Sequence, residues 1–174
     1  GSYYQWQRAS DGHEFRGSET TPKLADTWTD TGEAAGKFII NDNGWVKNNP
    51  LLPDNLWQAG EVGVNNPCPS GYHVPTEQEW EKFHLVVASS SGKSGGIGVF
   101  TNQMFTQTKL PNLAAASLRS EGEIQNNEDP LGYYWSSSAR ELNNTYMLYF
   151  YNGYSGVNEY STHDSGFSVR CIKD

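Results

Sequence analysis

The sequence is short of basic residues, cysteine and long apolar runs. Its 12 lysines and arginines stand against 20 aspartates and glutamates, and the net charge of -8 argues against nucleic-acid binding, which needs a basic surface to contact phosphates. No apolar stretch approaches the roughly 20 residues with which a helix crosses a membrane, so we expect no membrane-spanning segment. The residues after Gly1 form no signal-peptide pattern, and the N-terminus therefore does not indicate a localisation.

The only cysteines are Cys68 and Cys171, which lie far apart in the sequence. Neither belongs to a C-x-x-C pair of the kind found in redox and zinc motifs. From the residues alone two interpretations stay open. They are two buried thiols in a reducing compartment, or they form one long-range disulfide that joins the middle of the chain to its last strand.

The histidines are not arranged for catalysis or metal binding. His163 has triad-type neighbours in Ser161 and Asp164, but a triad is normally assembled from segments that are distant in sequence. His73 and His84 suit packed or solvated roles. The chain has no His/Cys ligand cluster, no EF-hand loop and none of the E-P-N, Q-P-D or W-N-D motifs of calcium-dependent lectins. We predict no catalytic activity, no metal and no cofactor.

One oxygen-rich segment, Asn126–Asp129, leaves two interpretations open. Its side chains are hard oxygen ligands of the type that Ca²⁺ prefers. The same residues also suit an acidic loop that is simply solvated. The sequence does not choose between them.

The length suits a single domain over residues 1–174. Alternating aromatic and polar residues predict a first strand at 3–8. Residues 9–60 are polar and rich in turn formers, which predicts a long surface loop or insertion. In its first part this insertion has three large anchors, Phe15, Leu24 and Trp28.

The strongest helix signal follows Thr76. Thr76 and Glu79 fit a capping box, in which each side chain accepts a hydrogen bond from the other residue's backbone N–H. An apolar face follows at helical spacing, and a Ser/Gly-rich segment starts at Ser89, so we expect the helix to end near Ala88. The face consists of Trp80, Phe83 and Val87.

The C-terminal region, 132–174, holds seven of the ten tyrosines, interleaved with serine, asparagine and glycine. Alternation predicts strands at 133–138, 145–151, 157–160 and 167–172. Tyrosine, serine and asparagine are also the residues of adaptable binding surfaces. For Tyr149 both exposure and burial beneath the N-terminal insertion stay open. The candidate ligand-binding residues are Asn143, Asn144, Tyr149, Tyr151, Asn152, Tyr154, Ser155, Asn158, Tyr160, His163 and Asp164.

Four segments carry a resemblance to a known family: NNPCPSGYHVPTEQEW (65–80), LGYYWSSS (131–138), YMLYF (146–150) and GFSVRCIKD (166–174). They resemble the Fibrobacter succinogenes major paralogous domain. The resemblance implies an α+β, C-type-lectin-like fold, with a twisted antiparallel sheet, one well-defined helix and long loops. It also implies a bacterial surface or secreted protein without catalytic chemistry. It places Cys68 and Cys171 as a disulfide pair, and Trp80 and Trp135 in the core.

Two further likenesses bear on function. The chain is similar to the variable proteins of diversity-generating retroelements, which diversify a C-terminal stretch to residue types that crowd 138–164. The alternative is that lectin-like sheets of this family are rich in Tyr, Ser and Asn whether or not they are diversified. Formylglycine-generating enzymes share the lectin-like fold, but they use a pair of nearby catalytic cysteines, whereas Cys68 and Cys171 match structural positions.

We therefore expect a non-catalytic domain that displays a Tyr/Asn/Ser-rich surface to a protein or glycan on another cell or particle, and diversification of that surface by a retroelement stays open. The alternative is a structural or adhesin module of a larger bacterial surface protein. The resemblance implies an extracellular, cell-surface or virion-associated location. The sequence names neither the ligand nor the oligomeric state.

Overall fold

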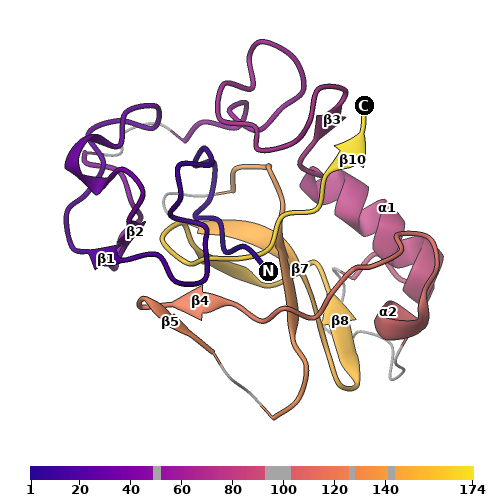
Figure 1. Ribbon diagram of the computed structural model, residues 1–174. Coiled ribbons are helices and arrows are strands. Elements are labelled where there is room, and N and C mark those ends of the chain that lie inside the picture. Colours follow the sequence, from indigo (N-terminus) through magenta and orange to yellow (C-terminus); the bar gives the residue numbers. More distant parts are fainter. Residues whose placement is uncertain (49–51, 93–102, 126–127, 141–143) are drawn as a thin grey trace.

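A four-stranded antiparallel sheet lies in the middle of the molecule (Figure 1). In this computed structural model, which describes residues 1–48, 52–92, 103–125, 128–140 and 144–174, β7 (Asn144–Tyr151) is the longest strand of that sheet. It pairs with β6 (Gly132–Trp135) and, through its C-terminal half, with β8 (Tyr154–Gly156). Its N-terminal end pairs with β9 (Tyr160–Thr162).

The other elements are short. They are β1 (Thr20–Thr21) paired in parallel with β2 (Phe38–Ile39), β3 (Tyr72–His73) antiparallel to β10 (Ile172–Lys173), β4 (Arg119–Ser120) antiparallel to β5 (Glu123–Ile124), the 3₁₀ turn η1 (Gly32–Ala34), α1 (Glu77–Ala88) and α2 (Gln103–Thr106). This mixed, sheet-rich architecture agrees with the predicted α+β class. Long irregular segments join the elements.

The helix α1 forms where the sequence predicts it. The Glu79 N–H donates to Thr76 Oγ1 at 3.2 Å, and the Thr76 N–H donates to Glu79 Oε1 at 3.1 Å, so the capping box is confirmed. The helix ends at Ala88, and Ser89 follows in the left-handed conformation with φ 57°. Trp80 is buried, and Phe83 packs against the same apolar cluster.

Both faces of β7 are buried at its centre, which makes the molecule three layers deep. Leu148 and Phe150 face α1 and pack in one cluster with Trp80. Because side chains alternate along a strand, Met147 and Tyr149 face the other way, into a second cluster to which the N-terminal segment contributes Trp6 and Trp57. Figure 1 shows the arrangement, with α1 on one side of the sheet and β1 and β2 on the other.

The N-terminal segment places buried aromatic anchors over this second face of the sheet and so forms an N-terminal layer, while many of its residues between 9 and 60 stay exposed in irregular structure. Trp6, Trp45 and Trp57 are fully buried, and each indole N–H donates to a backbone carbonyl. These bonds satisfy the one polar group of each ring, so burial of the large apolar surface carries no unpaired donor. Phe15, expected as an anchor, is instead 62% exposed.

Three predicted strands also need correction. Residues 3–8 form only an isolated bridge from Tyr4 to Phe167, because Gln7 has φ 61°, which no regular strand accommodates. Residues 157–159 join β8 to β9 rather than forming a strand. Of 167–172, only Ile172 belongs to a strand, β10.

Candidate functional site

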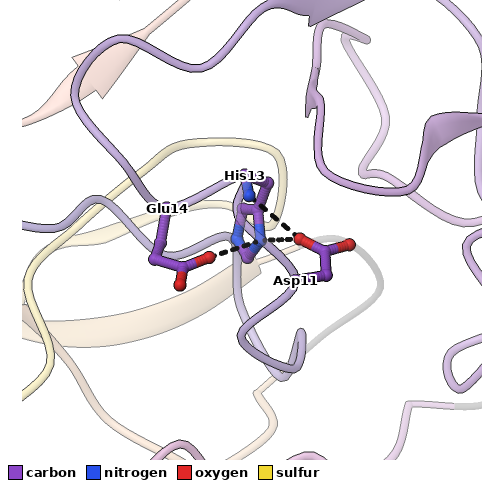
Figure 2. A group of neighbouring side chains, drawn as sticks. All are labelled: Asp11, His13 and Glu14. Atoms are coloured by element: carbon purple, nitrogen blue, oxygen red, sulfur yellow. Dashed lines mark hydrogen bonds and ion pairs between the residues drawn. The ribbon is translucent and has the colours of Figure 1, made fainter.

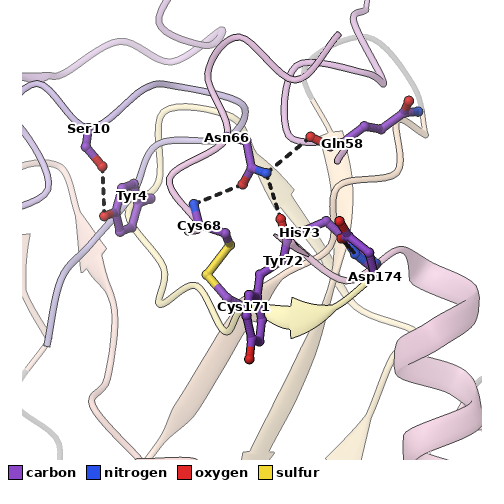
Figure 3. The surroundings of a disulfide bond; sticks show 9 residues. All are labelled: Tyr4, Ser10, Gln58, Asn66, Cys68, Tyr72, His73, Cys171 and Asp174. Carbon is purple, nitrogen blue, oxygen red and sulfur yellow. Dashed lines mark hydrogen bonds and ion pairs between the residues drawn. A yellow bond between two sulfur atoms is a disulfide. The ribbon is translucent and has the colours of Figure 1, made fainter. Parts of the chain in front are cut away.

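The disulfide between Cys68 and Cys171 is present, as the resemblance implies (Figure 3). It stands beside the two-residue ladder of β3 and β10. His73, on β3, holds the C-terminal end to α1: its ring contacts Asp174 Oδ1 at 2.7 Å and Glu79 Oε1 at 2.9 Å. Burial by itself would lower the pKa of His73, but the hydrogen bonds to these two carboxylates outweigh burial and raise it.

Three of the candidate ligand-binding residues lie in the interior: Tyr149, Ser155 and His163. The hydroxyl of Ser155 contacts His84 Nε2 at 2.9 Å, on the α1 side of the sheet. His163 stacks on Trp6 with ring centroids 4.1 Å apart, and burial lowers its pKa to about 3. Their burial speaks against the predicted contact role: Ser155 is turned toward α1, whereas Tyr149 and His163 pack against the N-terminal layer.

The buried hydroxyl of Tyr149 contacts Asn158 and lies close to Gly156. Its hydroxyl donates to Asn158 Oδ1 at 2.7 Å, so Asn158 is engaged within the fold. The phenol lies across β8, where a Cβ on Gly156 would come within 2.7 Å of the Tyr149 oxygen. A side chain at residue 156 would therefore displace the Tyr149 hydroxyl and the Asn158 side chain from these positions. Burial raises the pKa of Tyr149.

From Tyr149 a row of rings leads outward to solvent. We call the set Tyr133, Tyr149, Tyr151 and Tyr154 the tyrosine ladder. Successive ring centroids are 6.5, 6.0 and 5.2 Å apart. Tyr149 is 2% exposed and Tyr154, at the far end, is 39% exposed. The outer end surrounds the β7–β8 turn, where Asn152 is also exposed.

Glu159 lies beside the ladder, a feature that sequence reasoning missed. Glu159 remains exposed to solvent, and its partial desolvation raises the pKa of its carboxyl. Burial is the main cause that raises the pKa of Tyr133, Tyr149 and Tyr151, and the negative charge of Glu159 raises the pKa of each further. The ladder thus combines aromatic rings, phenol hydroxyls and one carboxylate. Tyr133 also belongs to the ladder, because β6 pairs with β7 so that Tyr133 lies opposite Tyr149 on the same face of the sheet.

A second tyrosine group belongs to the opposite face of the sheet. Tyr146 alternates with Met147 and so shares the face of Leu148, and it pairs with Tyr160 of β9. The guanidinium of Arg140 lies over both rings, 4.6 Å from the Tyr146 centroid and 4.1 Å from that of Tyr160. The tyrosines expected to form one contact surface therefore lie on two faces of the sheet. On the second face, Arg140 already makes cation–π contacts with both rings.

The remaining candidates lie away from the ladder. Asn144 and Asp164 are partly buried, and the backbone carbonyl of Asp164 accepts from Gln5 Nε2 at 2.7 Å. Burial raises the pKa of the Asp164 carboxyl. Asn143 lies outside the described residues, as does half of the oxygen-rich segment at 126–127, so neither prediction is tested.

One group in the described part of the chain has metal-ligand chemistry: Asp11, His13 and Glu14 (Figure 2). His13 Nε2 accepts the Gln5 N–H at 3.1 Å, which leaves the ring proton on Nδ1, 2.7 Å from Asp11 Oδ1. Asp11 also pairs with the guanidinium of Arg8 at 2.7 Å. Both ring nitrogens are engaged and a cation is already present, so we interpret the group as a structural network. Burial lowers the pKa of His13 and favours its neutral form.

Neither α1 nor α2 has the length and apolar character of a membrane-spanning helix. No match to the chain was found among curated proteins or among solved structures. The family model of the Fibrobacter succinogenes major domain matches residues 1–173. That match spans nearly the whole sequence, including the disulfide, α1 and the central sheet. The chain therefore belongs to the Fibrobacter succinogenes major domain family.

Proposed function

We propose that this domain is a non-catalytic binding module that recognises a protein or glycan with the outer end of the tyrosine ladder. The observation that carries the proposal is the ladder itself: rings in successive contact that run from buried Tyr149 to exposed Tyr154. Tyrosine supplies large contact area at low entropic cost, and a ring held by its neighbour loses even less freedom on binding. Asn152 and Glu159 add polar groups at its margin.

The fold proposed for this module is C-type-lectin-like, and its proposed location is extracellular or at a cell surface. The disulfide supports that location, because such bonds persist in oxidising compartments. We also propose that the β7–β8 turn is a site of sequence diversification. Asn152 and Tyr154 are exposed there, whereas Tyr149 is buried and would be held constant. A reverse transcriptase gene and a near-copy of the 3′ coding region beside the gene would support this idea.

The binding proposal is tested with Tyr154→Ala against Tyr72→Ala. The two tyrosines match well as a pair, because Tyr72 is 40% exposed and also lies in a strand, but far from the ladder. The probes are a glycan array and peptides selected from a random phage-displayed library on the wild-type protein. We expect Tyr154→Ala to weaken the selected probes by about thirtyfold or more, as at a hot spot, and Tyr72→Ala to leave them unchanged.

Both variants should melt within a few degrees of the wild type, because surface substitutions change stability by roughly 0.5 kcal/mol or less. Probes that bind the wild type but ignore both Tyr154→Ala and Tyr151→Ala would overturn the proposal. A glycan hit and a peptide hit would separate the two ligand classes.

A further inference from the structure

A groove runs along α1 on the side of the sheet opposite the tyrosine ladder. Its volume is about 420 Å³, within the range of small-ligand sites. The helix supplies Val86, which is 63% exposed, and the edge of the aromatic pair Trp80 and Phe83, whose ring centroids are 5.7 Å apart. Leu110 closes the apolar lining from another segment.

Two lysines flank this apolar lining. Lys82 comes from α1 and Lys109 from the segment before Leu110. Within the part of the chain that the structure describes, neither ammonium group has an ion-pair partner. Two unneutralised cations beside one groove stand out in a chain with only 12 basic residues and a net charge of -8.

The one carboxylate in the lining does not neutralise them. Glu79 accepts the Thr76 N–H as part of the helix cap and contacts His73 Nε2 at 2.9 Å. Burial by itself would raise the pKa of Glu79, but these hydrogen bonds outweigh burial and lower it. The contact between Glu79 and His73 also raises the pKa of His73. The Glu79 oxygens are thus engaged by the helix cap and by His73, and no ion pair in the described part of the chain joins them to Lys82 or Lys109.

We propose that this groove binds a small amphipathic carboxylate, with an aromatic or aliphatic body on the apolar lining and the carboxylate between Lys82 and Lys109. The apolar body removes the surface of Val86 and the aromatic edges from water, which supplies most of the affinity. The lysines select an anion over a neutral molecule of the same shape. This ligand site shares no residue with the tyrosine ladder and is independent of it.

The test compares 3-phenylpropanoate with 3-phenylpropan-1-ol, which has the same apolar body and no charge. Each is titrated into ¹⁵N-labelled protein and followed by amide chemical shifts. We expect shifts around Lys82, Val86 and Lys109, with the carboxylate bound about two- to thirtyfold tighter, the range for two exposed charge pairs. Equal affinity of the two probes, or shifts centred elsewhere, would overturn the proposal.

Two sets of variants sharpen the result. Val86→Asp places a charge in the groove, whereas Leu85→Asp, at a neighbouring residue that is 54% exposed, places it outside the groove. Both add the same charge to the same helix turn, so their cost to the helix is matched. Val86→Asp should abolish binding and Leu85→Asp should retain it. Replacing both Lys82 and Lys109 by glutamine should bring the carboxylate down to the affinity of the alcohol.

Equal loss in the two aspartate variants, or no effect of the double glutamine variant, would refute the assignment. Tyr154→Ala should leave these titrations unchanged. Failure of this inference is therefore distinguishable from failure of the binding role proposed for the ladder.

Discussion

Replacing Cys68 and Cys171 together by serine should destabilise the protein strongly without changing its folded contacts. The bond closes a loop with a sequence separation of 103 residues. In the chain-entropy account, opening a loop of this length returns roughly 4.7 kcal/mol of conformational freedom to the unfolded chain. For a domain of this size, each 1 kcal/mol lowers the melting temperature by about 2–4 °C, so we expect a fall of roughly 9–19 °C.

The structure also says where the loss appears first. The last strand, β10, is held by two paired residues, by the disulfide and by the contact of His73 with Asp174. A two-residue ladder is not stable alone. Without the bond, amides near Ile172 should therefore exchange hydrogen faster than the core strand β7, well before global unfolding.

The assay is urea unfolding of the oxidised protein, the reduced protein and the double serine variant, followed by tryptophan fluorescence. The free energy of unfolding should drop by about 3–5 kcal/mol in both the reduced protein and the variant. Thiol titration of the non-reduced, denatured protein should find no free thiol. Two reactive thiols in that sample, or a loss below about 1 kcal/mol, would refute the reasoning.

Two further predictions concern the start of α1 and its neighbour. Thr76→Ala removes the N-cap oxygen and should cost about 1 kcal/mol in urea unfolding, while Thr76→Ser keeps that oxygen and should cost little; equal losses would contradict the capping role. Because the folded-state pKa of His73 is raised, its contacts with Glu79 and Asp174 stabilise the protein fully below the unfolded-state pKa near 6.5, and this stabilisation is lost as pH rises through the folded-state pKa. Relative to His73→Gln, the wild type should be more stable by roughly 0.2–1 kcal/mol at pH 5.5 and lose that advantage by pH 9; a pH-independent difference would contradict it.

The position of Tyr149 shows what sequence patterns leave open. Alternation puts Leu148 and Phe150 on one face of β7 and Tyr149 on the other, and the structure has this alternation. Whether the second face meets water depends on a segment far away in the chain. Trp6 and Trp57 pack in the cluster on this face, so Tyr149 is interior, Tyr151 is half-buried and Tyr154 is the exposed ring.

The two surface lysines of the groove were beyond sequence reasoning for a similar reason. Lys82 and Lys109 carry no local signal, and they come together only because α1 packs beside the segment that precedes Leu110. Arg140 likewise meets Tyr146 and Tyr160 through pairing of β7 with β9. None of these neighbours is fixed by spacing along the chain.

The sequence by itself determined the features that depend on neighbouring residues: the capped helix at Thr76, the alternation along β7 and the family motifs that imply the bond between Cys68 and Cys171. These follow from hydrogen bonds and side-chain directions within a few residues, or from a motif matched as a unit. The tertiary structure alone decided which tyrosines reach solvent. That choice depends on packing between distant segments, where the buried indoles of the N-terminal layer take one face of the sheet and leave only the outer end of the ladder open.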